Sequence, residues 1–115
     1  MPKGPEYQRQ QRITRALRQY GWLHTHFRPL RTEAGYRTPL SGDKGYPDIT
    51  AVHPDRGILL FIEVKANRGM YSDDQKMWLG ALGHIACDDV QVWGVGSDEA
   101  EADLLSFISG GAMST

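Results

Sequence analysis

Three polar side chains, those of Asp48, Glu63 and Lys65, lie where an expected hairpin would bring them together. Residues 46–53 and 57–65 are expected to be strands, because Pro-Asp-Arg-Gly between them has the composition of a turn. Regular pairing about that turn places Asp48 opposite Glu63 on one face of the sheet, and a β-bulge would shift this pairing by one residue. Lys65 shares that face with Glu63, because side chains alternate along a strand.

This arrangement predicts a site for a divalent cation. Two adjacent carboxylates repel each other unless a positive charge lies between them, and Mg²⁺ or Mn²⁺ prefers carboxylate, carbonyl and water oxygens. Lys65 would then orient an attacking water or stabilise charge on a phosphate. For an isolated Glu-x-Lys sequence, a salt bridge on a solvated strand is the commoner explanation. The opposing Asp48, which follows Pro47, favours the metal site.

Glu6 and Gln75 are two further candidates, each with two interpretations. Glu6 is aligned with Ile13 over an expected helix at 6–20, so it either faces a metal or its waters, or complements the helix dipole in the first turn. Gln75 is expected to face inward, but it also completes a Ser72-x-x-Gln75 capping box. On pattern alone, the two interpretations of Glu6 are balanced and capping is favoured for Gln75.

Hydrophobic periodicity and turn residues predict the other elements. Residues 29–45 are expected to form a long polar loop. Trp78, Leu79, Leu82, Ile85 and Ala86 are expected on one face of a helix. The chain then has the order α-β-β-β-α-β-α, with helices at 6–20, 72–86 and 98–108 and strands at 22–28, 46–53, 57–65 and 90–95. This order predicts one α/β domain over residues 1–115, with a small central mixed β-sheet flanked by helices.

Composition excludes several classes of protein. Cys87 is the single cysteine among 115 residues, so an internal disulfide is impossible, and we expect a buried thiol. The sequence shows no membrane-spanning run and no signal-peptide pattern, which predicts a soluble cytoplasmic domain. The net charge of −1 conceals an asymmetry. Residues 1–40 carry eight Lys and Arg against two Glu, and the remainder carries five against twelve acids, which predicts a basic surface beside an acidic site.

The basic residues favour a surface that follows a nucleic-acid backbone, although a solvated helix face is the simpler alternative. Arginines recur every three residues at Arg9, Arg12, Arg15 and Arg18. Tyr46 would stack on an unpaired base or serve in packing. His24 and His26 alternate onto one strand face, without a zinc-ligand spacing to the other histidines. The candidate DNA-binding residues are Arg9, Arg12, Arg28, Arg31, Arg37, Lys44, Tyr46 and Arg68.

Taken in order, these motifs resemble the VRR-NUC domain, the virus-type replication-repair nuclease family of the PD-(D/E)XK superfamily. The likeness covers about residues 5–108 and rests on Gly45-Tyr46-Pro47-Asp48, Ile62-Glu63-Val64-Lys65 and Ser72-x-x-Gln75-x-x-Trp78-Leu79, after a helix that ends at Gly21-Trp22. It implies a restriction-endonuclease-like fold and a Mg²⁺ or Mn²⁺ cofactor. The implied ligands are Asp48, Glu63 and the Val64 backbone carbonyl. Lys65 is the implied catalytic lysine, and Glu6 and Gln75 match the family's helix glutamate and motif glutamine.

The resemblance implies a structure-selective DNA endonuclease that acts on Holliday junctions or other branched DNA in phage or bacterial replication, recombination or repair. The two-fold character of a junction favours a homodimer, and the lack of a separate sequence-reading module favours recognition of shape. One alternative is a non-catalytic nucleic-acid-binding subunit, against which Asp48, Glu63 and Lys65 argue. The other is a sequence-specific restriction-type endonuclease, for which the chain is small.

Overall fold

The computed structural model describes residues 4–26, 30–32, 35–37 and 42–111, with 30–32 and 35–37 as backbone. Among the described residues, one helix is followed by five strands, after which helix and strand alternate. The elements are α1 (Pro5–Gln19), β1 (Leu23–His26), β2 (Leu30–Thr32), β3 (Gly35–Arg37), β4 (Ile49–His53), β5 (Ile58–Val64), α2 (Asp73–Ile85), β6 (Val90–Val95) and α3 (Asp98–Ile108). Apart from β2 and β3, this is the order that the sequence predicts.

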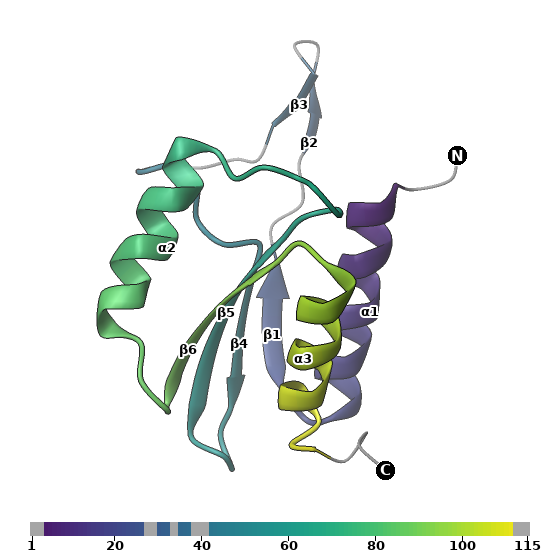
Figure 1. Cartoon of the computed structure of the whole chain (residues 1–115), viewed down its shortest axis with the longest axis vertical. Coiled ribbons are helices and arrows are strands. Elements are labelled where there is room, and N and C mark those ends of the chain that lie inside the picture. Colours follow the sequence, from purple (N-terminus) through teal and green to yellow (C-terminus); the bar gives the residue numbers. More distant parts are fainter. Residues whose placement is uncertain (1–3, 27–29, 33–34, 38–41, 112–115) are drawn as a thin grey trace.

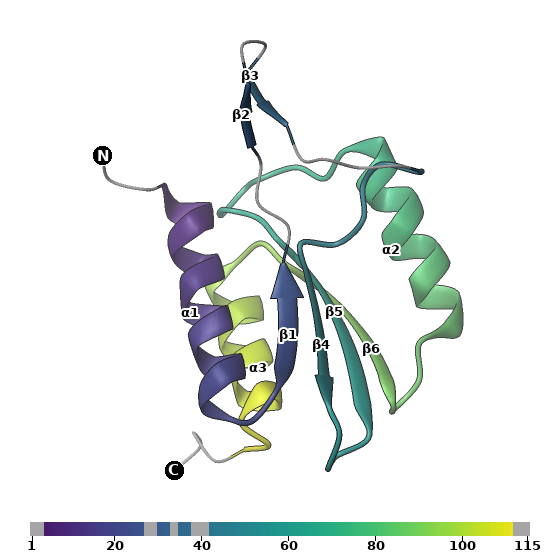
Figure 2. The same cartoon turned by 180° about the vertical axis from the view of Figure 1, so that it is seen from behind.

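A four-stranded mixed sheet forms the centre of the molecule, in the order β1-β4-β5-β6. Strands β1, β4 and β5 pair antiparallel, and β6 pairs parallel to β5 after the α2 crossover. Helices α1 and α3 cover one side of the sheet and α2 lies on the other (Figures 1 and 2). The predicted α/β architecture, a small mixed sheet with helices on both sides, is confirmed.

The β4–β5 hairpin has the predicted register. Ile49 pairs with Ile62 and Thr50 pairs with Phe61, so Asp48 at the entrance to β4 is level with Glu63. Along β5, Leu60 through Val64 are all buried, which is the pattern of a central strand covered on both faces. The position of the two carboxylates therefore follows from strand pairing rather than from a flexible loop.

The expected loop at 29–45 is wrong in part, because it contains a short antiparallel hairpin. Leu30 pairs with Arg37 and Thr32 with Gly35, which joins β2 to β3 as a separate two-stranded sheet. Strands of three residues are too short to show a period in the sequence. The hairpin rises beyond the end of the central sheet at which β1 ends and β4 begins (Figure 1).

The hydrophobic core lies between the sheet and the α1–α3 layer. Ile13 and Leu17 of α1 and Leu104 of α3 are fully buried against Ile49 and Ile62 of the sheet. Trp22 closes one end of this core, where its indole N–H donates to the carbonyl of Ile108 at 2.9 Å. This layer fixes the sheet, and with it the ends of β4 and β5.

Helix α2 packs much less closely than its sequence predicts. No residue of α2 is buried in the described part of the chain, and Ile85, expected on an inward face, is 63% exposed. Trp78 is half-buried and packs edge-on against Tyr46, with 5.0 Å between the two ring centroids. Cys87, expected to be buried, is exposed just after this helix. Among the described residues, no helix is long and apolar enough to cross a membrane.

Candidate active site

Asp48 and Glu63 meet where β4 begins and β5 ends. One oxygen of Asp48, Oδ2, accepts a hydrogen bond of 2.8 Å from the backbone N–H of Val64. The side chain of Glu63 is among the most deeply buried in the protein, in a residue only 1% exposed. Its burial, and then the adjacent carboxyl group of Asp48 and its negative charge, raise the pKa of Glu63 to about 9. Glu63 therefore holds a proton at neutral pH until a positive charge compensates the pair.

Gln75 joins this carboxylate pair from the first turn of α2. Its Oε1 accepts from the backbone N–H of Ser72 at 2.8 Å, and its backbone N–H donates to Ser72 Oγ at 3.1 Å. Its Nε2 donates to Glu63 Oε2 at 3.1 Å. The predicted capping box is present, and the same side chain also faces the site, so the two interpretations of Gln75 hold together.

Glu63 Oε1 has no hydrogen-bond partner among the described residues, although it is buried. A buried acceptor without a partner costs about 1–3 kcal/mol, and more when it is charged. A cation beside Asp48 and Glu63 would satisfy this oxygen and compensate both carboxylates, so these residues fit a bound divalent metal. No group of three His, Cys, Asp or Glu gathers in the described part of the chain. The site then depends on two carboxylates plus carbonyl and water oxygens, a donor set that suits Mg²⁺ or Mn²⁺.

Lys65 and Tyr71 lie next to each other beside the two carboxylates. The Lys65 ammonium lies 5.9 Å from the ring centroid of Tyr71, within range of a cation–π contact. Burial, and then the charges of Glu63 and Asp48, raise the pKa of the Tyr71 phenol. Tyr71 is not among the site residues predicted from the sequence. The one available signal was Gly94 inside β6, because a Cβ there would lie 2.6 Å from the Tyr71 hydroxyl.

Gly45 brings α2 to the carboxylates. Its backbone has φ +96°, and a Cβ at this position would lie 2.4 Å from the backbone carbon of Asp74. The segment that leads to Asp48 therefore packs directly on the first turn of α2, which contains Gln75. This contact explains why a glycine precedes Tyr46-Pro47-Asp48.

Glu6 lies in the first turn of α1 and is exposed, not turned inward as its alignment with Ile13 predicts. Its charge is nevertheless among those that raise the pKa of Glu63, which places Glu6 within electrostatic reach of the site. The helix begins only at Pro5, so its first turn extends past the covered part of the sheet. Glu6 therefore borders the site from solvent.

Two of the predicted DNA-binding arginines form ion pairs with acidic residues of α3. Arg9 is 3% exposed and pairs with Glu101 and Asp98, so it offers no surface to DNA. Arg12 points both Nε and Nη2 at the carboxylate of Glu101. Arg9 lies four residues before Ile13 on the same helix face, and this spacing predicts that Arg9 is buried. Burial therefore rules out DNA contact for Arg9, whereas Arg12 stays 48% exposed beside Glu101.

Arg15 and Arg18, the other arginines of α1, are exposed and line a cavity of about 290 Å³. His24 and His26 of β1 lie on the opposite wall of this cavity. Burial, and to a smaller extent the charge of Arg18, lower the pKa of His24. Arg15 and Arg18 therefore add two cations to the exposed surface of α1.

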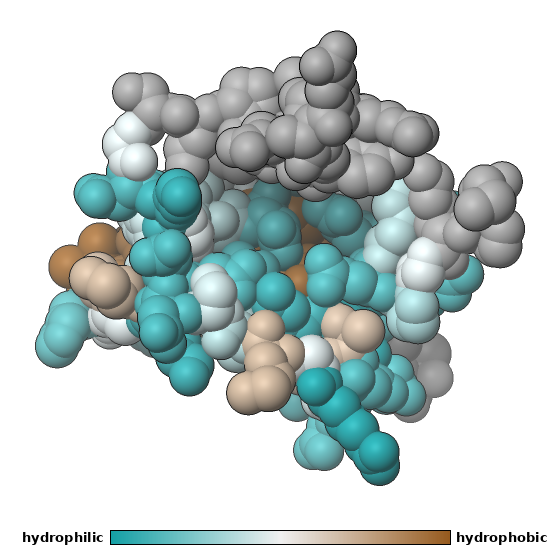
Figure 3. Space-filling model, turned by 90° about the horizontal axis from the view of Figure 1, so that it is seen from above, coloured by the Kyte–Doolittle hydropathy of each residue, from teal (hydrophilic) through white to brown (hydrophobic). Residues whose placement is uncertain are grey.

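The remaining DNA-binding candidates lie near the site end of the sheet. Lys44 and Arg68 are exposed, and Lys44 lines a groove of about 550 Å³ beside Trp78. Tyr46 serves in packing, through ring contacts and a 2.7 Å hydrogen bond between its hydroxyl and Thr50 Oγ1. Arg28 lies outside the described residues, and for Arg31 and Arg37 the structure describes the backbone of β2 and β3 only. From above, this end shows a hollow with mainly hydrophilic walls (Figure 3).

Comparison with known proteins gives consistent results. A family model of the VRR-NUC domain matches residues 5–95. A solved structure described as a VRR_NUC domain matches with a TM-score of 0.58 and 20% sequence identity, over 90% of this chain and 97% of that chain. No curated protein matches the sequence.

Proposed function

Because the chain belongs to the VRR-NUC domain family, and is thus a nuclease domain of the PD-(D/E)XK type, we propose that it is a metal-dependent DNA endonuclease selective for branched DNA. Nucleases of this type generally use divalent metals, and Mg²⁺ or Mn²⁺ is the cofactor that we propose here. The proposed setting is phage or bacterial replication, recombination or repair. The proposed substrates are Holliday junctions and related branched structures.

One observation carries this proposal: the buried Glu63 Oε1, which has no partner among the described residues, lies beside Asp48 and two residues before Lys65. A pure binding protein gains nothing from two adjacent carboxylates facing a phosphate, because they would repel it. A bound divalent cation would supply Lewis-acid chemistry for hydrolysis of a phosphodiester. The orphaned oxygen therefore favours a catalytic domain over a non-catalytic binding subunit.

The residues of the chain have distinct roles in this proposal. Asp48 and Glu63 hold the cation, each with one oxygen already oriented by a hydrogen bond from the protein. The Val64 carbonyl is a proposed third ligand, and Glu6 is proposed to act through water because it is exposed. Lys65 orients the attacking water or stabilises charge on the phosphate. Gln75 keeps Glu63 Oε2 in place, which leaves Oε1 for the metal.

The proposed DNA-binding surface combines exposed cations with the β2–β3 hairpin. Lys44 and Arg68 flank the site, and Arg15 and Arg18 extend the basic surface along α1. Arg31 and Arg37 lie on the hairpin beyond the end of the sheet (Figure 2). Contacts of this kind follow phosphates and do not read bases, which favours recognition of DNA shape. A homodimer would present two sites to the two-fold arms of a junction.

The test is cleavage of duplex, single-stranded, flap and four-way-junction DNA of matched sequence, with Mg²⁺, Mn²⁺ or EDTA. We expect metal-dependent cleavage that is faster on the junction than on the duplex. Asp48→Ala and Lys65→Ala should each lower the rate by at least about 100-fold. Binding that persists in EDTA with no cleavage in either metal would support the non-catalytic alternative. Full activity in both variants would contradict the proposed site.

A further inference from the structure

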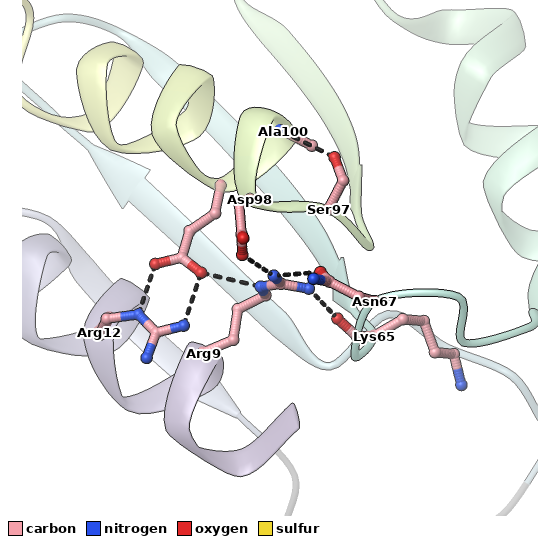
Figure 4. Close-up of polar contacts among 8 residues, drawn as sticks. Arg9, Arg12, Lys65, Asn67, Ser97, Asp98 and Ala100 are labelled. Carbon is pink, nitrogen blue, oxygen red and sulfur yellow. Dashed lines mark hydrogen bonds and ion pairs between the residues drawn. The ribbon is translucent and has the colours of Figure 1, made fainter. Parts of the chain in front are cut away.

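Arg9 is a charged residue in the interior of the protein, and each nitrogen of its guanidinium donates at least one hydrogen bond. Nε donates to Glu101 Oε1 at 2.8 Å, and Nη1 donates to the backbone carbonyl of Lys65 at 2.6 Å. Nη2 donates to Asn67 Oδ1 at 2.7 Å and to Asp98 Oδ1 at 2.8 Å. Figure 4 shows these contacts converging on Arg9 from α3 and from the segment after β5.

The helical layer accounts for the charge of Arg9 without help from Lys65. Ser97 caps α3 by accepting from the backbone N–H of Ala100 at 3.0 Å, and this cap places Asp98 and Glu101 in the first turn (Figure 4). Hydrogen bonds from Arg12 and then Arg9 hold the pKa of Glu101 below its usual range. Asp98 and Glu101 therefore balance the guanidinium groups of Arg9 and Arg12 together. The bonds of Arg9 to Lys65 and Asn67 serve another purpose than charge pairing.

These two bonds hold the turn that carries Lys65. The turn is tight: Gly69 N–H donates to the Ala66 carbonyl at 2.9 Å, and Arg68 adopts φ 64°, a left-handed conformation that costs energy for a residue with a side chain. The backbone N–H of Lys65 donates to the Val95 carbonyl at 2.8 Å. The peptide groups of Lys65 are thus held by β6 on one side and by Arg9 on the other.

We propose that Arg9 is a positioning residue for Lys65, which fixes the backbone of the catalytic lysine to the α1–α3 layer. Arg9 touches neither DNA nor metal in this role. It supplies a planar donor group that reaches Lys65, Asn67 and the acids of α3 at once, which a lysine side chain cannot do. The inference rests on the proposed function for its catalytic part. Its structural part, the anchoring of residues 65–69, stands without it.

The experiment compares Arg9→Lys with a matched control, Arg56→Lys. Arg56 is half-buried and, like Arg9, donates to backbone carbonyls, but its partners are Phe107 and Ile108 at 2.9 and 3.1 Å, at the far end of α3. We measure kcat and KM for metal-dependent cleavage and hydrogen exchange of the Lys65 and Gly69 amides. The unfolding midpoint is measured for each variant. Asn67→Ala, on the exposed turn, is a milder variant that should fold in any case.

We expect Arg9→Lys to lower kcat by about 10- to 100-fold with little change in KM, because a small displacement of a catalytic group is costly. Exchange of the Lys65 and Gly69 amides should accelerate at least about tenfold, while the α2 amides stay unchanged. Asn67→Ala should give the same pattern more weakly, and Arg56→Lys should alter neither kcat nor these amides. Unchanged exchange and unchanged kcat in both Arg9→Lys and Asn67→Ala would overturn the proposal.

The two readouts separate this inference from the nuclease proposal. If the wild-type protein cuts no DNA, the proposed function fails, while faster exchange of the Lys65 and Gly69 amides in Arg9→Lys still supports the anchoring. If the wild type cuts DNA and Arg9→Lys loosens the turn without lowering kcat, the positioning role is wrong although the nuclease assignment stands. An equal loss of kcat in Arg56→Lys at equal stability would also overturn it.

Discussion

The side-chain amide of Gln75 donates to Glu63 at 3.1 Å while the oxygen of the same amide caps α2 through the Ser72 backbone at 2.8 Å. The first turn of a loosely packed helix is thereby tied to Glu63, the most buried carboxylate among the described residues. Because Oε1 of the amide is already engaged, its NH₂ group is the end that faces Glu63. The cap thus fixes which oxygen of Glu63 remains for a cation.

Substitutions at Ser72 and Gln75 should separate the capping of α2 from the role of Gln75 at the site. Ser72→Ala should cost about 1 kcal/mol of unfolding free energy, the usual value of a lost N-cap, with kcat within a few-fold of wild type. Gln75→Ala should cost a similar amount but lower kcat by at least about tenfold, because Glu63 Oε2 loses its donor. Urea unfolding and single-turnover cleavage measure the two effects. Equal kcat in the two variants would assign Gln75 to capping alone.

Gly45 should be intolerant of substitution for a steric reason. Gly45→Ala places a Cβ 2.4 Å from the Asp74 backbone at φ +96°, so α2 must move away from Glu63. Gly42→Ala is the matched control, because Gly42 has φ +101° but nothing within 4 Å of the added Cβ. We expect Gly42→Ala to cost only the backbone strain of about 1 kcal/mol. Gly45→Ala should cost at least about 2 kcal/mol more and lower cleavage, as thermal unfolding and rate measurements would show.

The metal-free protein should lose stability as the pH rises. Glu63 has a folded pKa of about 9 against an ordinary value of 4.5, so folding favours its protonated form. The resulting stabilisation is complete below about pH 4.5 and disappears as the pH rises through about 9. Urea unfolding in EDTA should show this decline in wild type and a flatter profile in Glu63→Gln. Glu99→Gln, which removes an exposed carboxyl, should keep the wild-type slope.

Metal binding should release a proton from Glu63. Because the carboxyl must ionise to hold a cation, the apparent affinity for Mn²⁺ should rise about tenfold per pH unit up to about pH 9. Calorimetry in two buffers of different ionisation enthalpy measures the released proton, expected to be about one per cation at neutral pH. Asp48→Asn should weaken binding. An affinity that is independent of pH would contradict the assignment of Glu63 as a ligand.

The exposed arginines of α1 should contribute to DNA affinity through charge alone. Replacing Arg15 and Arg18 by glutamine should weaken binding to all DNA forms about equally and reduce the salt-dependence slope by about two. Fluorescence anisotropy over a salt series in Ca²⁺, which is expected to slow cleavage, would measure this slope. An unchanged slope would place the DNA away from this face of α1.

The pairing of Asp48 with Glu63 could be predicted from the sequence, because a tight turn and the two-residue period of strands set the register locally. The α2 cap could be predicted as well, since Ser72 and Gln75 are three residues apart. These features depend on neighbours along the chain. Hydrophobic spacing was a weaker guide on α2, where an apolar pattern did not lead to burial, and it gave no signal for β2 and β3.

The contacts that join distant elements could be recognised only in the folded structure. Arg9 lies on the helix face of Ile13, but its partner Glu101 is 92 residues away, so the sequence could not indicate which group would pair with its charge. The position of Tyr71 beside Lys65 and of Gln75 beside Glu63 likewise depends on how a crossover helix and its loop dock on the sheet. Docking is set by the shape and charge of whole surfaces, so these contacts emerge only when the layers are assembled.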